Sequence, residues 1–475
     1  MSARIDQKRN FLFFLNEIYP VHVDDCLTGA LVSPSSWEAV AQRVESSRQK
    51  DVFARSIDKV HLYVHVPFCE RLCSFCHCSR VLLRQRSDID AYIKDLARQM
   101  TILSPAYQGM DAGLIQFGGG TPSILDERQL SAILDGVDKS FPSRNRQIQF
   151  EANPSSWSAS KLALLSSRGL YRLSIGVQTL DEKILKYVSR PQTRKKVLGC
   201  LRLAQKAGIP QVNVDLMAGL PGQTVEGFIH DLKDVISEGM DFINIQPYTS
   251  LSWQLLCGPG ETIPAFFNRR DAMMKMAKEV LAQAGFTRKG FWGIYSRQEE
   301  VDDPQEEVYT HLQAALAAFG PFARGLFPGA VFYRAGTVRP GAVNTQVESC
   351  AQDLDYTMSH YAVLALINGL DEQAFLKRFR VSIDRHCGEG LRYLQESGLV
   401  AFSKGIWKFS GKWEIRRIRE YFALSRALFG KGLLSRLRER FVNGYDPRHD
   451  YSSGNSLLKA YADSTLMVVY YRMGC

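Results

Sequence analysis

Residues 60–78 read VHLYVHVPFCERLCSFCHC and combine a strand pattern with a cysteine-rich loop. The first seven residues are mostly β-branched, aromatic or aliphatic, which is typical of a buried strand. Three cysteines follow at once with the spacing C-x3-C-x2-C, at Cys69, Cys73 and Cys76. A short loop can bring three thiolates together at a metal centre. The stretch therefore predicts a strand over Val60–Val66 that leads into a metal-binding loop.

From residue 60 to about residue 291, short apolar runs of β type alternate with amphipathic helical stretches. This alternation is typical of parallel strands joined by crossover helices. Six β/α units favour an α/β fold with a partial (β/α)6 barrel, whose catalytic groups belong at the carboxyl ends of the strands. The further strands are expected at Gly113–Phe117, Gln147–Ala152, Arg172–Val177, Gln211–Met217 and Phe242–Ile245. The helices are expected at Ile89–Leu103, Glu127–Ser140, Ala159–Arg168, Arg194–Ala207 and Val225–Glu238.

A chain of 475 residues is long enough for two or three domains. We expect a leader at 1–59 that packs on the barrel, and the barrel core itself at 60–291. Residues 292–350 are rich in Gly and Pro and are expected to form an irregular connection near the active site. Residues 351–430 predict a mostly helical C-terminal domain, in which the pattern of residues 391–409 resembles a small winged-helix unit. A basic amphipathic helix is expected near Trp413–Phe429, and the tail at 431–475 has no clear structure.

The cysteine spacing alone leaves two metal centres open. A [4Fe–4S] cluster held by three thiolates keeps one iron open for another ligand. A zinc ion would need a fourth protein ligand, which Cys78 or His77 could supply. The other six cysteines are scattered singly, and we expect them to be small buried hydrophobic residues. They are Cys26, Cys200, Cys257, Cys350, Cys387 and Cys475.

Further motifs at the strand ends settle the preference for iron. The cysteine loop, the segment GGGTP at 118–122 and the polar residues that end the later strands resemble those of the radical S-adenosylmethionine (SAM) enzymes. The flanking Y-x-H-x-P-F-C and F-C-x-C resemble the branch of the oxygen-independent coproporphyrinogen III oxidases. The match extends from about Leu62 to Tyr248. Within that branch Cys78 is not a cluster ligand, whereas many relatives, including heme chaperones and methyltransferases, carry an aromatic residue at its position.

This resemblance implies a set of site residues. Cys69, Cys73 and Cys76 are expected to hold the [4Fe–4S] cluster. The positions expected to contact one SAM molecule or a second one, or to lie beside the cofactors, are Tyr63, Phe75, Cys78, Gly119, Gly120, Thr121, Glu151, Gln178, Arg190, Asp215 and Met217. Polar groups such as Glu151 and Asp215 interrupt apolar strands, where burial is costly unless something binds them.

The resemblance also implies the chemistry. One electron from a reduced cluster would split SAM into methionine and a 5′-deoxyadenosyl radical, which abstracts hydrogen from a substrate in the barrel mouth. The expected cofactors are the [4Fe–4S] cluster and SAM, with a second SAM in some branches. The expected partners are a small organic substrate and a one-electron donor such as flavodoxin or ferredoxin.

Three functions fit this pattern. The first is oxidative decarboxylation of a propionate on coproporphyrinogen III or a similar tetrapyrrole, for which Arg324 or Arg334 could hold carboxylates, although a surface role is favoured for both. The second is transfer of a methyl or methylene group from a second SAM. The third is heme binding as a chaperone, which Cys78 disfavours. The family's Gly-x-Gly-x-Ser stretch is replaced here by residues 318–325, AFGPFARG, so the substrate is left open.

Composition excludes other classes of protein. Hydrophobic residues make up 45% and charged residues 23%, as in ordinary globular enzymes. No signal peptide and no apolar run long enough to cross a bilayer is visible, so a cytoplasmic location is expected. The net charge of +10 is spread along the chain, apart from a denser run at residues 412–440 that we interpret as a solvated helix face. No nucleic-acid signature accompanies it, and nucleic acid is not expected as a partner.

Overall fold

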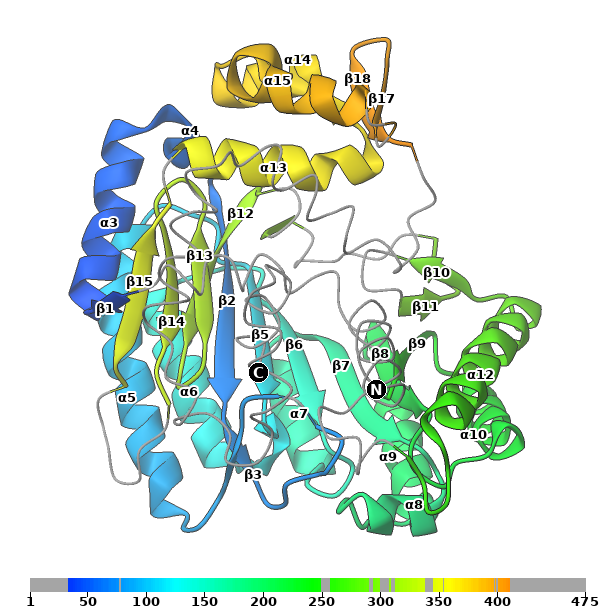
Figure 1. Ribbon diagram of the computed structural model, residues 1–475. Coiled ribbons are helices and arrows are strands. Elements are labelled where there is room, and N and C mark those ends of the chain that lie inside the picture. The colour runs from blue at the N-terminus through cyan, green and yellow to red at the C-terminus, as the bar shows by residue number, and fades with distance from the viewer. Residues whose placement is uncertain are drawn as a thin grey trace, which may run out of the picture.

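A computed structural model describes residues 33–410, except 77, 249–256, 290–293, 300–306, 309–311, 338–344, 353, 397 and 399. Within these residues, the core is a 13-stranded sheet in the order β1-β15-β14-β13-β12-β2-β5-β6-β7-β8-β9-β11-β10. Figure 1 shows the sheet curving from β15 at one side to β9 at the other, with helices over its outer face. The predicted α/β fold with a partial barrel is confirmed.

The middle of the sheet is parallel and consists of β/α units. Its strands are β2 (Lys59–Val66), β5 (Leu114–Gly119), β6 (Gln147–Ala152), β7 (Leu170–Gln178), β8 (Gln211–Ala218) and β9 (Phe242–Pro247). The helices are α5 (Ser87–Leu103), α6 (Glu127–Ser140), α7 (Ala159–Ser167), α8 (Glu182–Tyr187), α9 (Arg194–Lys206), α10 (Val225–Ser237) and α12 (Ile263–Gln283). All six predicted strands and all five predicted helices are present, with ends shifted by one or two residues.

Helix ends in this region are fixed by side-chain caps. Asp126 caps α6 in a capping box, because its carboxylate accepts from the backbone N–H of Gln129 while the Gln129 amide oxygen accepts from the backbone N–H of Asp126. Thr193 and Thr224 cap α9 and α10 with their hydroxyl groups. Such caps satisfy N–H groups that a helix leaves without partners, and each contributes about 1 kcal/mol. They explain why the sequence predicts these starts so well.

The N-terminal part of the described chain covers one side of the sheet. It contains β1 (Ser33–Ser35), α3 (Trp37–Lys50) and α4 (Val52–Arg55). Strand β1 pairs antiparallel with β15, and the buried ring of Trp37 packs edge-on against Tyr333 with centroids 5.7 Å apart. Strand β1 therefore lies beside a strand that follows more than 300 residues later in the chain, and residues 33–59 pack on this side of the sheet (Figure 1).

The expectation of an irregular stretch at 292–350 is wrong in its secondary structure. This region contains β11 (Ile294–Ser296), β12 (Ala314–Phe319), β13 (Arg324–Phe327), β14 (Val331–Ala335) and β15 (Val347–Ala351), while β10 (Thr287–Lys289) precedes it. Strand β12 lies parallel to β2 and extends the barrel sheet by one strand. Its sequence AALAAF has no strand pattern because nearly every residue is buried, and burial decides the structure where propensity does not.

The C-terminal module consists of α13 (Leu354–Asn368), β16 (Leu370–Asp371), α14 (Glu372–Phe379), α15 (Ile383–Glu396), β17 (Val400–Ser403) and β18 (Ile406–Phe409). Three helices with a small sheet in the order β16-β18-β17 agree with the predicted winged-helix resemblance. Figure 1 places α14 and α15 beyond α13, at the end of the sheet opposite to the short strand β3 (Phe68–Cys69). The expected helix at 413–429 and the tail at 431–475 lie outside the described residues.

Candidate active site

The cysteine loop leaves the sheet at the carboxyl end of β2. The loop lies between β3 and β4 (Val81–Leu82), which pair in parallel. The backbone N–H groups of Val81 and Leu83 donate to the carbonyls of Pro67 and Cys69. Inside the loop the backbone N–H of Cys76 donates to the carbonyl of Cys73 over 3.3 Å. The loop is therefore fixed at both ends and turns tightly through the segment that carries the last two cysteines.

Neighbouring elements hold this loop in place. The backbone N–H of Ser74 donates to the carbonyl of Val188, just after α8, over 3.1 Å. The guanidinium of Arg80 donates to the carbonyls of Cys73 and Cys78 over 2.8 and 3.0 Å. The sequence did not single out Arg80, although a basic residue two positions after the last cysteine was a signal that could have found it.

The thiols of the loop contact residues predicted to belong to the site. The Sγ of Cys69 lies 3.3 Å from the hydroxyl of Thr121, and the Nη1 of Arg190 lies 3.8 Å from the Sγ of Cys73. Burial raises the pKa of the Cys69 thiol, and negative charge on Cys76 and Cys73 would raise it further. The three thiols are thus close enough to interact electrostatically, and a cationic metal centre would favour their thiolate forms.

These residues fit an iron–sulfur cluster better than a zinc ion. Within the described residues, which exclude His77, no group of three or more His, Cys, Asp or Glu side chains could hold a single metal ion. A cubane distributes three thiolates over three irons, so its ligands stand farther apart than those of one tetrahedral ion. Cys78 is exposed, and the buried Nε of Arg190 has no hydrogen-bond partner among the residues that the structure describes. An anionic group beside Arg190 would provide that partner.

The glycine motif after β5 packs directly against the loop. A side chain on Gly119, whose φ is +104°, would lie 2.7 Å from the ring of His65. A side chain on Gly120 would lie 2.8 Å from the backbone of Pro67 and Phe68, and the Gly120 N–H donates to the carbonyl of Val66 over 2.8 Å. Only glycine permits this close approach of two backbones. The motif therefore brings Thr121 to Cys69.

Two partly buried carboxyl groups stand on β6 and β8, the strands on either side of β7. Burial and the nearby negative charge of Asp215 raise the pKa of Glu151, on β6, to about 8. Burial also raises the pKa of Asp215, on β8, although the amides of Asn213 and Asn244 donate to it over 3.0 and 3.1 Å. Sequence reasoning missed both asparagines. Both are polar residues within apolar strands. Asn213 also lies two residues before Asp215, which places the two side chains on the same face of the sheet.

Gln178 and Arg190 lie at the end of β7. Gln178 has a φ of +70° and follows an irregularity in the pairing of β7 with β8. The Nη2 of Arg190 donates to the carbonyl of Gly176 over 2.6 Å, which leaves Nη1 directed at Cys73. A non-glycine residue with left-handed backbone is strained and is found mostly where the surrounding structure forces it. The chain turns sharply at Gln178, and after α8 the side chain of Arg190 lies against the thiol of Cys73.

An apolar cluster closes the site on the side of α8 and α12. Phe75 and Met217 pack with Ile184, Val188, Leu220, Tyr248, Phe266 and Phe267, and the half-buried Cys73, Cys76 and Cys257 pack against them. Tyr63 points to the opposite side, where its hydroxyl lies 3.1 Å from the Nδ1 of His65. Of the scattered cysteines within the described residues, Cys200 and Cys387 are buried, as expected, whereas Cys257 and Cys350 are only half-buried.

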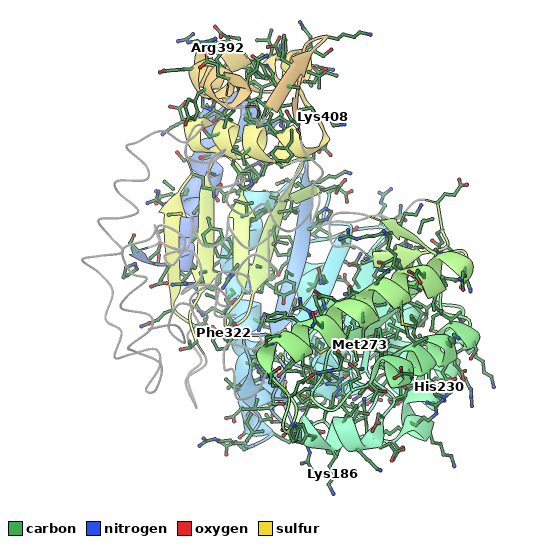
Figure 2. The ribbon with its side chains drawn as sticks, turned by 45° about the vertical axis from the view of Figure 1, so that its right-hand side comes forward. Lys186, His230, Met273, Phe322, Arg392 and Lys408 are labelled. Carbon is green, nitrogen blue, oxygen red and sulfur yellow. The ribbon has the colours of Figure 1, made fainter. Side chains whose placement is uncertain are left out.

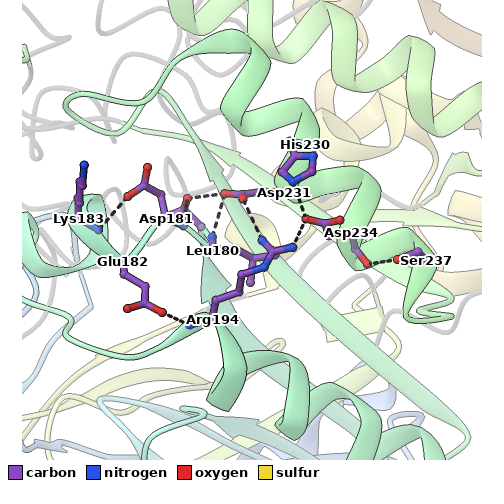
Figure 3. A network of polar contacts seen from close by, with 10 residues as sticks. Leu180, Asp181, Glu182, Lys183, Arg194, His230, Asp231, Asp234 and Ser237 are labelled. Carbon is purple, nitrogen blue, oxygen red and sulfur yellow. Dashed lines mark hydrogen bonds and ion pairs between the residues drawn. The ribbon is translucent and has the colours of Figure 1, made fainter.

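A network on α8, α9 and α10 supports the turn from β7 to the cysteine loop (Figure 3). The buried carboxylate of Asp231 accepts from the hydroxyl of Thr179 and from the backbone N–H of Leu180, over 2.5 and 2.8 Å. Arg194 approaches Asp231 and forms an ion pair with Asp234. The start of α8 is thereby attached to α10, and α8 in turn contacts the cysteine loop through Val188.

Comparison with known proteins agrees with this geometry. Residues 63–235 match the family model of the Radical SAM superfamily. Residues 63–235 form a radical SAM domain. Every predicted site residue lies inside this domain, from Tyr63 to Met217.

Curated relatives of the radical SAM domain include two oxygen-independent coproporphyrinogen III oxidases. The protein of Escherichia coli is 32% identical over 191 residues, covering 40% of this chain and 42% of its own length. That of Salmonella typhimurium is 27% identical over 328 residues, covering 68% and 65%. The heme chaperone HemW of Bacillus subtilis is 34% identical over 177 residues, covering 37% and 46%. The chain thus spans between about two fifths and two thirds of the length of these relatives.

Among solved structures, coproporphyrinogen III oxidase (HemN) from Escherichia coli has a TM-score of 0.65 at 22% identity, covering 80% of this chain and 93% of that one. This likeness extends beyond the radical SAM domain and supports the fold as a whole. No helix within the described residues has the length and apolar character needed to cross a membrane.

Proposed function

We propose that this chain is a HemN-like radical SAM enzyme that cleaves SAM at a [4Fe–4S] cluster on Cys69, Cys73 and Cys76. The observation that carries the proposal is the arrangement of three neighbouring thiols on one loop, beside Thr121 and Arg190, with Cys78 turned to solvent. When bound, the reduced cluster supplies the electron that splits SAM into methionine and a 5′-deoxyadenosyl radical.

The protein's own groups bind and orient in this proposal. Gly119 and Gly120 let the glycine motif pack against the cysteine loop, which places the backbone of this motif where the amino-acid part of SAM is expected to bind. Glu151 and Asp215 offer carboxyl oxygens for an ammonium or for ribose hydroxyls, in a buried site where such contacts are strong. Phe75 and Met217 exclude water from one side of the site.

The lead substrate is a tetrapyrrole that carries propionate groups, such as coproporphyrinogen III, which would lose two carboxyl groups by oxidation. The names of the relatives support this class of substrate. The alternatives are transfer of a methyl or methylene group from a second SAM, and heme binding as a chaperone. The similarity to HemW supports the chaperone.

The cluster assignment is tested by comparing cysteine variants. Cys69→Ser, Cys73→Ser and Cys76→Ser, each reconstituted without oxygen, should lose most iron and sulfide and all formation of 5′-deoxyadenosine. Cys78→Ser serves as the matched control and should keep the iron content and the absorption spectrum of the wild type. Equal loss of metal in all four variants, or zinc in place of iron, would contradict the proposal.

The reaction is tested by mass spectrometry of the product. Reconstituted enzyme with dithionite, SAM and coproporphyrinogen III should release 5′-deoxyadenosine and a tetrapyrrole lighter by two carboxyl groups. Formation of S-adenosylhomocysteine and a methylated product would show that the reaction is methyl transfer and not decarboxylation. Tight heme binding without 5′-deoxyadenosine would favour the chaperone.

A further inference from the structure

The guanidinium of Arg80 joins the middle of the cysteine loop to its end. Arg80 follows Cys78 by two positions and directly precedes β4. Its Nη2 donates to the carbonyl of Cys73 over 2.8 Å, and its Nη1 donates to the carbonyl of Cys78 over 3.0 Å. The rigid, planar fork of a guanidinium suits such paired contacts, whereas an ammonium group is a single point charge. Arg80 therefore bridges the segment that carries the last cysteines.

The residues on both sides of Arg80 are attached to the end of β2. The backbone N–H of Val81 donates to the carbonyl of Pro67 over 2.8 Å. The carbonyl of Ser79 lies 2.8 Å from the Nε2 of the buried His65. The backbone that carries Arg80 is thus held on the sheet, and its guanidinium can hold the loop.

The carbonyl of Cys73 is the point that Arg80 holds most closely. It also accepts from the backbone N–H of Cys76, over a longer 3.3 Å. The backbone N–H of Ser74 donates to the carbonyl of Val188 over 3.1 Å, which attaches the same turn to the end of α8. Because the bond within the turn is long for an N–H donor, the bond from Arg80 is expected to contribute much of the order of this turn.

Arg80 also brings an uncompensated positive charge to the site. Its two Nη groups bind carbonyls, and within the described residues it forms no ion pair with a carboxylate. Its Nε is buried and has no hydrogen-bond partner among those residues. Burial raises the pKa of the Cys69 thiol, the hydroxyl of Thr121 lowers it, and the charge of Arg80 lowers it further. The field of Arg80 therefore reaches a thiol that its hydrogen bonds do not touch.

A fixed charge at this place acts on a redox centre. The reduced state of an iron–sulfur cluster carries one more negative charge than the oxidised state, and its reduction potential depends on the charges and hydrogen bonds around it. A nearby cation therefore favours the reduced state. A guanidinium keeps its proton at every pH that the protein tolerates, so this effect would be constant.

We propose that Arg80 is a positioning residue with two roles: its guanidinium holds the cysteine loop closed before the cluster binds, and its charge raises the reduction potential of the bound cluster. The inference rests on the proposed function for the identity of the cluster. Arg80 binds backbone carbonyls, so it acts through the loop and through its electrostatic field and not as a ligand.

The first role is tested on cluster-free protein by hydrogen exchange and mass spectrometry. In Arg80→Gln, peptides that cover residues 73–78 should exchange at least tenfold faster than in the wild type, because the loop opens more often. Arg80→Lys should show a similar increase, since its ammonium group lacks the fork. Arg84→Gln, at an exposed position two residues after β4, is the matched control and should exchange as the wild type does. Wild-type exchange in Arg80→Gln would overturn the first role.

The second role is tested by redox titration of the reconstituted cluster without SAM, followed by electron paramagnetic resonance. In Arg80→Gln the ratio of reduced to oxidised cluster at a given potential should fall about tenfold, which corresponds to a midpoint lower by about 59 mV. Arg80→Lys keeps the charge and should stay within about threefold of the wild type. An unchanged ratio in Arg80→Gln, or equal decreases in both variants, would overturn the second role.

Uptake of the cluster separates the roles if Arg80→Gln takes up none. Uptake by Arg80→Lys would then support the role of the charge, and failure of both variants would contradict it. The unfolding midpoint of each cluster-free variant, compared with that of Arg84→Gln, shows whether a loss is confined to the loop.

The inference and the proposed function fail in different ways. If the wild type takes up no iron, the proposed function fails, while hydrogen exchange of the cluster-free protein still decides the first role. If the wild type holds a cluster and cleaves SAM, and both Arg80 variants match it in exchange and in potential, only the inference about Arg80 is refuted.

Discussion

The ring of His65 occupies the space that any side chain at position 119 would need. Gly119→Ala would force the new carbon to within 2.7 Å of that ring at a φ of +104°. We expect the free energy of unfolding to fall by about 2–4 kcal/mol, from backbone strain and overpacking together. Denaturant unfolding measures this loss. Gly199→Ala on α9 is the control, because a side chain there meets open space, and it should stabilise by about 0.5–1 kcal/mol.

His65 also couples folding to pH. Burial lowers the pKa of His65 to about 4, with a further decrease from Arg324. The unfolded chain binds a proton near pH 6.5 that the folded chain does not bind until about pH 4, so stability is lost as the pH falls through this window. The contribution is about 3 kcal/mol at most.

Unfolding free energies of the cluster-free protein, compared at pH 7 and pH 4.5, test this coupling. The wild type should lose more stability than His65→Asn, which cannot take up the proton. Equal losses in the two proteins would show that His65 is not a source of acid sensitivity.

At the scale of elements, α8 links the sheet to the cysteine loop and depends on a single buried carboxylate. Asp231→Ala would leave the N–H of Leu180 and the hydroxyl of Thr179 without their acceptor (Figure 3). Breaking such a buried, partly ionic network costs about 2–4 kcal/mol. We expect this loss in urea unfolding, together with a lower iron content after reconstitution.

Asp234→Ala provides the comparison on the same helix. Asp234 is a quarter exposed and binds Arg194 and His230 at the surface. Its removal should cost less than about 1 kcal/mol and leave the iron content unchanged. Similar effects of the two substitutions would mean that Asp231 has no special part in holding α8.

Helices and strands with a clear period were predictable, and those without one were not. The alternation of polar and apolar residues in β6 and the apolar stripe of α6 mark the face that packs in the core, so the period predicts the type of each element. Strand β12 has no such contrast, because nearly all of its residues at 314–319 are buried, whichever face they lie on. Its place beside β2 depends on pairing with residues 255 positions away, such as Ala314 with Lys59.

At the scale of the whole molecule, the cysteine loop opens onto a surface with exposed apolar and basic side chains. Leu72 and Tyr187 are 46% and 59% exposed, and Arg71, Lys183 and Lys186 are exposed nearby. Figure 2 shows Lys186 at the lower end of the molecule. Under the proposed function a one-electron donor must come close to the cluster, and we expect Lys183 and Lys186 to attract an acidic carrier, although Asp181 and Glu182 are exposed beside them.

The double variant Lys183→Glu/Lys186→Glu tests this docking. Formation of 5′-deoxyadenosine with reduced flavodoxin should fall at least fivefold at low ionic strength, while the rate with dithionite stays the same. Lys139→Glu, exposed on α6, changes the same charge elsewhere and should have no effect. A parallel loss with both reductants would place the defect in the site itself and not in docking.

The sequence by itself predicted a metal-binding cysteine loop, a glycine motif and polar strand ends, because each is a short stretch with a recognisable spacing, while the preference for an iron–sulfur cluster came from the family resemblance. It also predicted the parallel β/α units, because the period of their apolar residues marks the faces that are buried. Only the tertiary structure decided that Arg190 lies against Cys73, that Asn244 donates to Asp215, and that Phe322 stands beside His65. These contacts join residues far apart in the chain, and no local pattern encodes which distant strands will become neighbours.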